Sequence, residues 1–202
     1  MEPSPNARTV QSYEEIAVAY AEETSGGGAF TEPLTRLAEA VPAGHVLDVG
    51  SGPGWDADEL EEAGLTVRRT DVTQAFIDLQ RARGKDVDRL DVIDDDLGGP
   101  YDAVVALRVL QHIEPKDLST VLSKVAGALR PGGRFLVSTP RFAGTGWEVG
   151  DSGRTYYRAP RTEDEFIEAL HASGLAPEWA EHSPEDDGWL VVMAQTAAER
   201  WL

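Results

Sequence analysis

The stretch that decides the fold is residues 45–55, which read HVLDVGSGPGW. An apolar run at residues 46–49 leads directly into three glycines at alternate positions and then into a segment with helical spacing. Glycine has no Cβ, so the backbone can turn sharply at these positions and approach a bound ligand closely. We therefore expect a ligand to lie across this turn, at the carboxyl ends of the strands of an open α/β sheet.

The spacing of the three glycines distinguishes between classes of nucleotide site. Dinucleotide-binding folds use the pattern G-x-G-x-x-G, whose third glycine packs the helix against the strand. Here the third glycine comes one residue early, at Gly54, and Trp55 stands where the dinucleotide pattern needs glycine. The phosphate-binding pattern that ends in Gly-Lys-Ser/Thr is missing as well. A nucleotide-dependent oxidoreductase is therefore the less favoured alternative.

Short apolar runs alternate with longer amphipathic stretches along most of the remaining chain. This alternation predicts strands at residues 46–49, 66–69, 87–90, 103–107 and 134–138, and helices at 57–63, 73–83, 115–129 and 163–172. Two further strands, near 178–181 and 189–195, would finish the sheet as an antiparallel pair. The expected fold class is α/β: a single domain with a mostly parallel seven-stranded sheet, helices on both faces and an antiparallel last strand.

The N-terminal segment has a helical pattern of its own. Residues 1–10 are expected to form a loose tail, followed by a helix from Ser12, where Ser12 and Glu15 have the spacing of a capping box. Tyr13 and Tyr20 recur at the spacing of one helix face. Three glycines at 26–28 separate this helix from a second one at 31–41. We expect residues 1–30 to form a tail and cap helix, and residues 31–202 to form the main domain.

Several motifs follow one another in the order typical of one enzyme family. The series Asp48-x-Gly50-x-Gly52-x-Gly54 resembles motif I of the class I S-adenosylmethionine-dependent methyltransferases. Residues 101–105 (YDAVV) and 110–113 (LQHI) resemble the family's fourth strand and the segment after it, and residues 129–135 (LRPGGRF) resemble its turn into the fifth strand. The resemblance covers roughly residues 10–195 and implies a Rossmann-like methyltransferase domain.

The resemblance also implies which residues bind S-adenosylmethionine and its product S-adenosylhomocysteine. The family's ribose-binding acid ends the second strand, where Asp71 stands about 20 residues past the glycines. The family's adenine-binding acid follows the third strand; Asp91 is preferred because it directly follows residues 87–90, and the acids at 94–96 stay open. Tyr13 or Tyr20 would contact the methionine end. The cofactor-binding set is Tyr13, Tyr20, Asp48, Gly50, Ser51, Gly52, Gly54, Asp71, Val72, Asp91, Val92, Leu107 and Arg108.

The family implies an in-line displacement at the methyl group, without a covalent enzyme intermediate. His112 is the candidate general base, because imidazole exchanges protons near neutral pH; the alternative is a structural histidine satisfied by the backbone. Residues 141–161 are expected either to overlie the acceptor or to form an ordinary surface loop. The candidate acceptor-binding residues are Gln111, His112, Arg141, Trp147, Tyr156, Tyr157 and Arg158.

The acceptor is expected to be an oxygen, nitrogen or carbon nucleophile of a small molecule. Residues 106–109 read ALRV where family members that methylate adenine or glutamine nitrogens often carry Asn/Asp-Pro-Pro-Tyr, which argues against that branch. A peptide or protein acceptor, or a catalytically silent binding partner with the same fold, are the alternatives.

Charge and composition limit the partners further. The 202 residues include 36 acidic and 18 basic side chains, and the net charge of −18 argues against nucleic acids and anionic membrane surfaces. The longest apolar runs are strand-sized, and the first ten residues lack the apolar core of a signal peptide. There is no cysteine, and the four histidines share no metal-ligand spacing with carboxylates. We expect a cytoplasmic enzyme, monomeric or homodimeric, without a metal.

Overall fold

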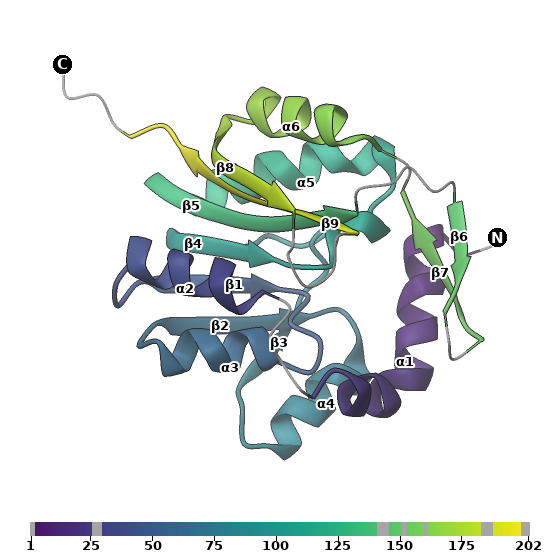
Figure 1. Cartoon of the computed structure of the whole chain (residues 1–202). Coiled ribbons are helices and arrows are strands. Elements are labelled where there is room, and N and C mark those ends of the chain that lie inside the picture. Colours follow the sequence, from purple (N-terminus) through teal and green to yellow (C-terminus); the bar gives the residue numbers. More distant parts are fainter. Residues whose placement is uncertain are drawn as a thin grey trace.

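A computed structural model describes residues 3–25, 30–140, 146–150, 153–159, 161–182 and 188–198, which form a layered α/β domain (Figure 1). Seven strands make one sheet in the order β3-β2-β1-β4-β5-β9-β8. The first five in this order run parallel, β9 is antiparallel to β5, and β8 is antiparallel to β9. The strands are β1 (His45–Val49), β2 (Thr66–Asp71), β3 (Val87–Arg89), β4 (Tyr101–Ala106), β5 (Leu129–Pro140), β8 (Leu175–His182) and β9 (Trp189–Thr196). The predicted fold class is confirmed.

Helices cover both faces of this sheet and bury an apolar layer on each. On one face lie α5 (Pro115–Ala128) and α6 (Glu163–Ala172), and on the other α2 (Thr31–Ala40) and α3 (Trp55–Glu62) (Figure 1). Successive strand residues point to opposite faces. Val104 of β4 accordingly packs with the α5 and α6 layer, while Val105 packs with the α2 and α3 layer. Each such side chain contributes about 1.5–3 kcal/mol when fully buried, so the sheet is held from both sides.

The first helix begins earlier than the sequence pattern predicts. Helix α1 spans Pro5–Glu23, and the prediction of a loose tail over residues 1–10 is wrong for the described part of that tail. Ser4 is the N-cap: its hydroxyl oxygen accepts the N–H of Ala7 at 3.1 Å, and Pro5 occupies the first helical position, where proline is favourable. The predicted capping box at Ser12 is also wrong, because the Ser12 hydroxyl donates to the carbonyl oxygen of Thr155 at 2.8 Å.

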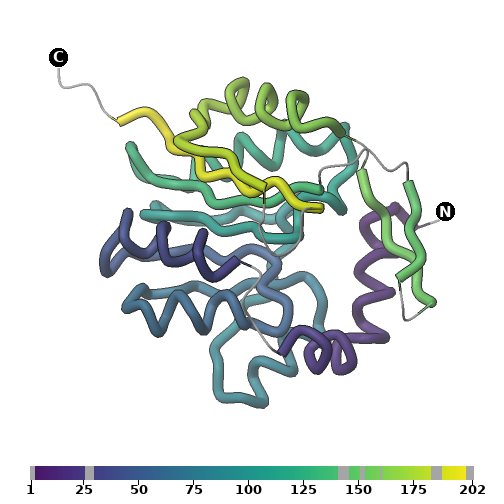
Figure 2. The backbone as a smooth tube through the Cα atoms, viewed as in Figure 1, coloured from purple at the N-terminus to yellow at the C-terminus, as the bar shows by residue number. Residues whose placement is uncertain are grey.

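A β-hairpin occupies a region for which the sequence predicts no strands. Strands β6 (Gly146–Val149) and β7 (Thr155–Arg158) form a separate two-stranded antiparallel sheet. Strand β7 packs along α1, where the backbone N–H of Tyr157 donates to the Thr9 hydroxyl at 2.9 Å and Arg154 pairs with Glu15. Figures 1 and 2 show α1 and the hairpin side by side across the carboxyl ends of the parallel strands.

The remaining differences are at element ends. Helix α4 (Gln74–Ala82) follows β2, and a short 3-10 helix η1 (Leu110–His112) follows β4. Strand β5 begins at Leu129 rather than at residue 134. It includes Pro131, Gly132 and Gly133, which the sequence pattern predicts to be a turn before the strand. One end of the sheet is enclosed by the glycine turn, by α1 and by the β6–β7 hairpin.

Candidate functional site

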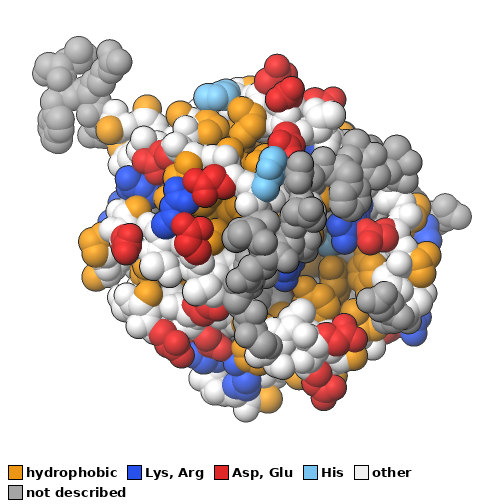
Figure 3. Space-filling view, viewed as in Figure 1, with side chains coloured by type: hydrophobic (Ala, Val, Ile, Leu, Met, Phe, Trp, Pro, Cys, Tyr) orange, Lys and Arg blue, Asp and Glu red, His pale blue; other side chains and the backbone are white. Residues whose placement is uncertain are grey.

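A cavity lies at the carboxyl ends of β1, β2 and β4, where open α/β sheets bind ligands. It holds about 1120 Å³, counting the space open to solvent at its mouth. In the space-filling view, an apolar hollow opens on this face (Figure 3). The walls come from α1, from the glycine turn, from the loops after β2, β3 and β4, and from Phe30. The cavity therefore lies where the glycine pattern predicts a ligand.

Two of the three motif glycines have different structural roles. Gly52 has a φ of +54°, and a Cβ built there would have no atom within 4 Å, so this position borders open space in the cavity. Gly54 has a φ of +88°, and a Cβ there would lie 2.4 Å from the Gln80 side-chain oxygen. That oxygen accepts a hydrogen bond from buried Arg69 at 3.0 Å. Gly52 leaves room for a ligand, whereas Gly54 leaves room for the packing of the turn.

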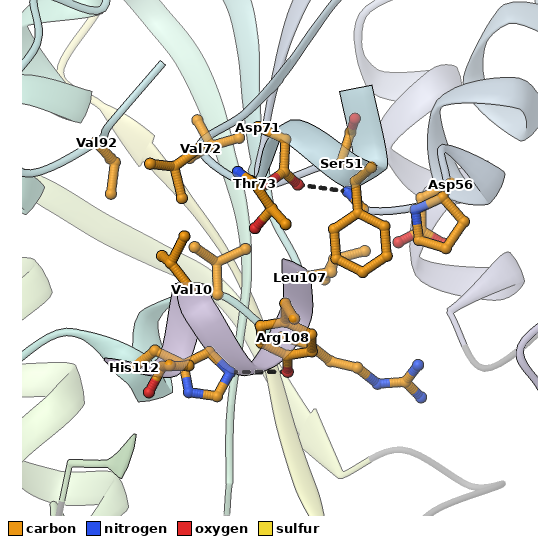
Figure 4. A pocket seen from close by; sticks show the side chains of 18 of the residues that line it. Val10, Ser51, Asp56, Asp71, Val72, Thr73, Val92, Leu107, Arg108 and His112 are labelled. Atoms are coloured by element: carbon orange, nitrogen blue, oxygen red, sulfur yellow. Dashed lines mark hydrogen bonds between the residues drawn. The ribbon is translucent and has the colours of Figure 1, made fainter. Parts of the chain in front are cut away.

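Asp71 holds the glycine turn in place from the end of β2. Its two carboxylate oxygens accept the backbone N–H groups of Gly52 and Thr73, each at 2.8 Å (Figure 4). Burial raises the pKa of Asp71, and the hydrogen bonds from Thr73 and Gly52 oppose this rise. A carboxylate has about four acceptor positions, so each oxygen keeps capacity toward the cavity that Asp71 lines.

Beside Asp71, several of the side chains that line the cavity are apolar. Asp91 and Val92 line it together with Leu90, Leu107 and Ile113. One carboxylate oxygen of Asp91 accepts the backbone N–H of Ile93 at 2.9 Å. The acids at 94–96 do not line the cavity. This wall suits a flat apolar ring with a polar edge.

Not every residue of the motif reaches the cavity. Gly50, Ser51, Gly52 and Val72 line it, but Asp48 and Gly54 lie behind it, buried in the turn. Burial raises the pKa of Asp48 well above its ordinary value, and one carboxyl oxygen of Asp48 has no hydrogen-bond partner.

On the opposite side of the cavity, His112 is held in one tautomer. Its Nδ1 lies 2.6 Å from the Tyr157 carbonyl oxygen, which can only accept, so Nδ1 carries the proton. Its Nε2 then accepts, and it lies 3.2 Å from both the Tyr13 hydroxyl and the Gln111 amide nitrogen. Burial lowers the pKa of His112 to about 4, so the ring is neutral near pH 7. The lone pair of Nε2 is thus directed to the side where Tyr13 covers the cavity.

Tyr13, which lies against His112, is packed among aromatic rings from α1, α4 and β7. The Tyr13 ring lies 5.7 Å from those of Tyr20 and His112, 5.8 Å from that of Phe76 on α4, and 4.9 Å from that of Tyr156 on β7, measured between centroids. Burial raises the pKa of Tyr13 above its usual range, so its hydroxyl stays protonated and acts as a donor to His112.

Arg108 and Asp56 bring charges of opposite sign into the cavity. Arg108 follows β4, and its guanidinium carbon lies 4.8 Å from the Phe30 ring centroid. Asp56 lies in the first turn of α3, and burial raises its pKa to about 6 while the charge of Arg108 opposes that rise. In Figure 4, Asp71 and Ser51 lie on one side of the cavity, and Arg108 and His112 on the other.

The predicted acceptor-binding residues are only partly brought together. Tyr156, Tyr157 and Arg158 lie on β7, behind the side chains that line the cavity, and Gln111 is buried beside His112. Trp147 is 39 % exposed, and the guanidinium of Arg8 lies over its ring. Arg141 falls outside the described residues.

Several cavity residues were missed by the sequence prediction. Thr9 and Val10 lie on the part of α1 that was expected to be a tail, although Ser4 followed by Pro5 would have indicated the true start. Asp56 resembles an ordinary acid in a first helical turn, where the helix dipole favours negative charge. Phe76 resembles an ordinary core residue of α4.

Metal sites and membrane-spanning helices are two further features to consider in the described residues. No cluster of three or more histidine, cysteine or carboxylate side chains that could hold a metal ion occurs in the part of the chain that the structure describes. Among the same residues, no helix combines the length and the apolar character that a membrane crossing needs.

Residues 47–135 match the family model described as a methyltransferase domain. A ubiquinone biosynthesis O-methyltransferase of Xylella fastidiosa is 33% identical over 116 residues, which cover 52% of this chain and 46% of the relative. A probable S-adenosylmethionine-dependent methyltransferase of Mycolicibacterium smegmatis is 33% identical over 111 residues, which cover 52% of this chain and 41% of the relative. The chain thus matches less than half of the length of these relatives.

Solved structures share the fold along nearly the whole chain. A 1,6-didemethyltoxoflavin-N1-methyltransferase of Burkholderia thailandensis, solved with 1,6-didemethyltoxoflavin and S-adenosylhomocysteine bound, superposes with a TM-score of 0.70 at 24% identity, covering 98% of this chain and 92% of the other. The [4+2]-cyclase SpnF superposes with a TM-score of 0.73 at 16% identity, covering 98% of each chain. At these identities, the superpositions establish the fold alone.

Proposed function

Because the chain belongs to the class I S-adenosylmethionine-dependent methyltransferase family, we propose that it transfers a methyl group from S-adenosylmethionine to a small molecule in this cavity. S-adenosylmethionine supplies an electrophilic methyl carbon on positively charged sulfur. The single observation that carries the proposal is the pairing of Asp71 with the open Gly52 turn, because it offers a carboxylate and bare backbone at one place.

The residues present fit this cofactor. Asp71 would accept hydrogen bonds from the ribose hydroxyls, since its two bonds to backbone N–H groups leave acceptor capacity toward the cavity. The apolar wall of Leu90, Val92 and Ile113 would pack on the adenine, with Asp91 at its polar edge. Tyr13 and Tyr20 from α1 would cover the methionine end and exclude water.

The chain's contribution to the chemistry is mainly alignment. Holding a nucleophile in line with a methyl group can lower a barrier by roughly 7–11 kcal/mol in favourable cases. His112 would accept a hydrogen bond from the O–H or N–H of the acceptor, because it is neutral and its Nε2 is the unprotonated nitrogen; its pKa of about 4 makes it a weaker base than an ordinary imidazole. Tyr13 now donates to that nitrogen, so an acceptor hydroxyl or N–H would take the place of the Tyr13 hydroxyl.

The small-molecule acceptor is supported by the relatives. Their names describe O-methylation in ubiquinone biosynthesis and N1-methylation of 1,6-didemethyltoxoflavin. The aromatic side chains over His112 suit a flat acceptor of this general kind. A peptide acceptor is less favoured, because α1 and the hairpin narrow the access to His112.

The proposal is tested by calorimetric titration with S-adenosylhomocysteine. We expect the wild type to bind and Asp71→Ala to lose at least tenfold in affinity, about 1.4 kcal/mol. Asp86→Ala is the matched control, because Asp86 is exposed and does not line the cavity. No binding by folded wild-type protein, or binding of NADH in its place, would overturn the proposal.

Binding alone does not decide the reaction, since a [4+2]-cyclase shares the fold. Transfer should therefore be followed with S-adenosylmethionine carrying a tritiated methyl group, with catechols and ring N–H heterocycles as acceptors. Label in a methylated acceptor that has been separated from S-adenosylmethionine is the expected result. Binding with no consumption of S-adenosylmethionine in cell extract would favour the catalytically silent alternative.

A further inference from the structure

Two opposite charges line the cavity without pairing with each other. Asp56 extends from the first turn of α3 and Arg108 follows β4 (Figure 4). Among the described residues neither of them forms a close ion pair, and the Arg108 side chain interacts with Tyr20. Buried Arg69, by contrast, is bonded to the carboxylates of Asp58 and Glu61 at 2.6 and 2.8 Å. The chain thus pairs a buried cation elsewhere but leaves these two charges facing the cavity.

The backbone of Arg108 is held in a conformation that side chains rarely adopt. Its φ is +57°, in the left-handed region, which costs a non-glycine residue roughly 1–2 kcal/mol. The Arg108 N–H donates to the Ser138 hydroxyl at 2.8 Å, and the Gln111 amide donates to the Arg108 carbonyl oxygen. Such strain persists where the surrounding structure enforces it, and it is concentrated at ligand sites. Here it places a guanidinium beside Phe30 at the cavity.

The charge of Asp56 depends on its surroundings in the cavity. Its pKa, raised to about 6 by burial and by Glu59, is held down by the charge of Arg108. Both charges also act on Tyr20: burial raises the pKa of its hydroxyl, the charge of Arg108 opposes this rise and the charge of Asp56 adds to it. At neutral pH, the carboxylate and the guanidinium therefore present a negative and a positive charge to one part of the cavity, next to Tyr20.

We propose that Asp56 and Arg108 together recognise an α-amino-acid group, namely the methionine end of S-adenosylmethionine. That group carries its ammonium and its carboxylate on the same carbon, so two opposite charges that face one cavity separately are complementary to it. The guanidinium would donate to the carboxylate, and the Asp56 carboxylate would accept from the ammonium, as charge-assisted hydrogen bonds. This assignment rests on the proposed function, gives Asp56 a role, and gives Arg108 a defined partner.

A purely electrostatic role for Arg108 would have a different effect on ligand binding. If Arg108 only offsets the charge of Asp56, its loss would disturb the cavity as a whole. Ligands with and without an amino-acid group would then be weakened together.

The test compares two ligands by calorimetry on the full chain. S-adenosylhomocysteine carries the amino-acid group, whereas 5′-methylthioadenosine keeps the adenosine and the sulfur but lacks it. We expect Arg108→Met and Asp56→Asn each to lower the affinity for S-adenosylhomocysteine at least tenfold, and to change the affinity for 5′-methylthioadenosine less than twofold. Unchanged binding of 5′-methylthioadenosine also reports that each variant is folded.

A third ligand assigns the carboxylate. The methyl ester of S-adenosylhomocysteine has no carboxylate charge, so it should bind the wild type more weakly than the parent acid, and bind Arg108→Met as well as the parent acid does.

Each other outcome counts against the inference. Equal losses for S-adenosylhomocysteine and 5′-methylthioadenosine, or no loss for either, would overturn it while wild-type binding upholds the proposed function. Wild-type protein that binds neither ligand would overturn the proposed function and this inference together.

Discussion

Asp48, in strand β1, carries a buried carboxyl group. Its side chain is 3 % exposed, one of its oxygens has no hydrogen-bond partner, and burial raises its pKa well above the ordinary value. A group whose pKa is raised by folding contributes fully to stability below its unfolded pKa, about 3.9, and this contribution is lost as the pH rises. Near neutral pH Asp48 therefore destabilises the fold.

Replacing this carboxyl with an amide of the same shape tests that account. We expect Asp48→Asn to raise the free energy of unfolding at pH 7.5 by roughly 1–3 kcal/mol, because the amide has no charge to bury. The gain should shrink as the pH falls toward 4.5. Urea unfolding of both proteins at the two pH values measures it. A difference that does not depend on pH, or a less stable variant at pH 7.5, would contradict this account.

The imidazole of His112 offers a second test at the scale of one residue. With its pKa lowered to about 4, the ring should stay neutral from pH 8 down to about 5 and protonate only as the pH approaches 4. Nitrogen NMR should show a constant Nδ1–H tautomer over that range. A midpoint between 6 and 7 would contradict the lowered pKa, and an Nε2–H tautomer would exclude the assignment of Nε2 as the proton acceptor.

The roles of residues were predictable at positions where only a few residue types can meet the chemical requirement. The alternate glycines and Asp71 follow from the need for bare backbone beside a carboxylate, and they line the cavity apart from Gly54. Asp56 could not be predicted, because its importance depends on facing Arg108 across the cavity. The sequence alone gives no measure of that proximity.

At the scale of elements, α1 is joined to the domain by its polar side chains. The Glu14 carboxylate accepts the backbone N–H groups of Gln74 and Ala75, at 2.6 and 2.8 Å, at the start of α4. The residue before α4, Thr73, makes no side-chain cap bond of its own. Glu14 therefore caps a helix from another element, and it connects α1 to the side of the cavity that Phe76 lines.

Removing this cap should loosen α1 and the first turn of α4 together. An N-cap contributes about 0.5–2 kcal/mol relative to alanine, so Glu14→Ala should speed amide hydrogen exchange at Gln74 and Ala75 roughly 2- to 30-fold. Glu23→Ala is the matched control, because Glu23 is an exposed residue of α1 for which no side-chain contact is described. Equal exchange in both variants would show that α1 docks without Glu14.

We further propose that residues 1–30 act as a cap over the bound cofactor. Saturating S-adenosylhomocysteine should then protect residues 10–25 of the wild type from proteolysis. Equal rates of cleavage with and without the ligand would contradict the proposal that residues 1–30 cap the cofactor.

The elements that the sequence predicted poorly are those held by distant partners. The start of α1 depends on Ser4, and the hairpin depends on contacts with α1, such as that between Thr9 and Tyr157. The central strands were predicted well, because they are apolar runs buried on both faces, and their pattern is local.

At the scale of the whole molecule, the fold places the candidate groups that line the cavity at one end of the sheet. The parallel order β3-β2-β1-β4-β5 brings the loops after β1, β2, β3 and β4 together, and α1 with the hairpin covers them (Figure 2). The alternation of strands and helices was sufficient to predict a mostly parallel sheet with helices on both faces. The way in which α1 and the hairpin cover these loops was not predictable in detail, since it depends on how the two elements dock against each other.

A crystal structure of the protein grown with S-adenosylhomocysteine would show whether the cofactor binds in this cavity. We expect ligand density there, with the ribose hydroxyls bonded to Asp71, the adenine beside Asp91 and Val92, and the amino-acid group between Asp56 and Arg108. Density at another site, or an adenine on the His112 side of the cavity, would contradict this expectation.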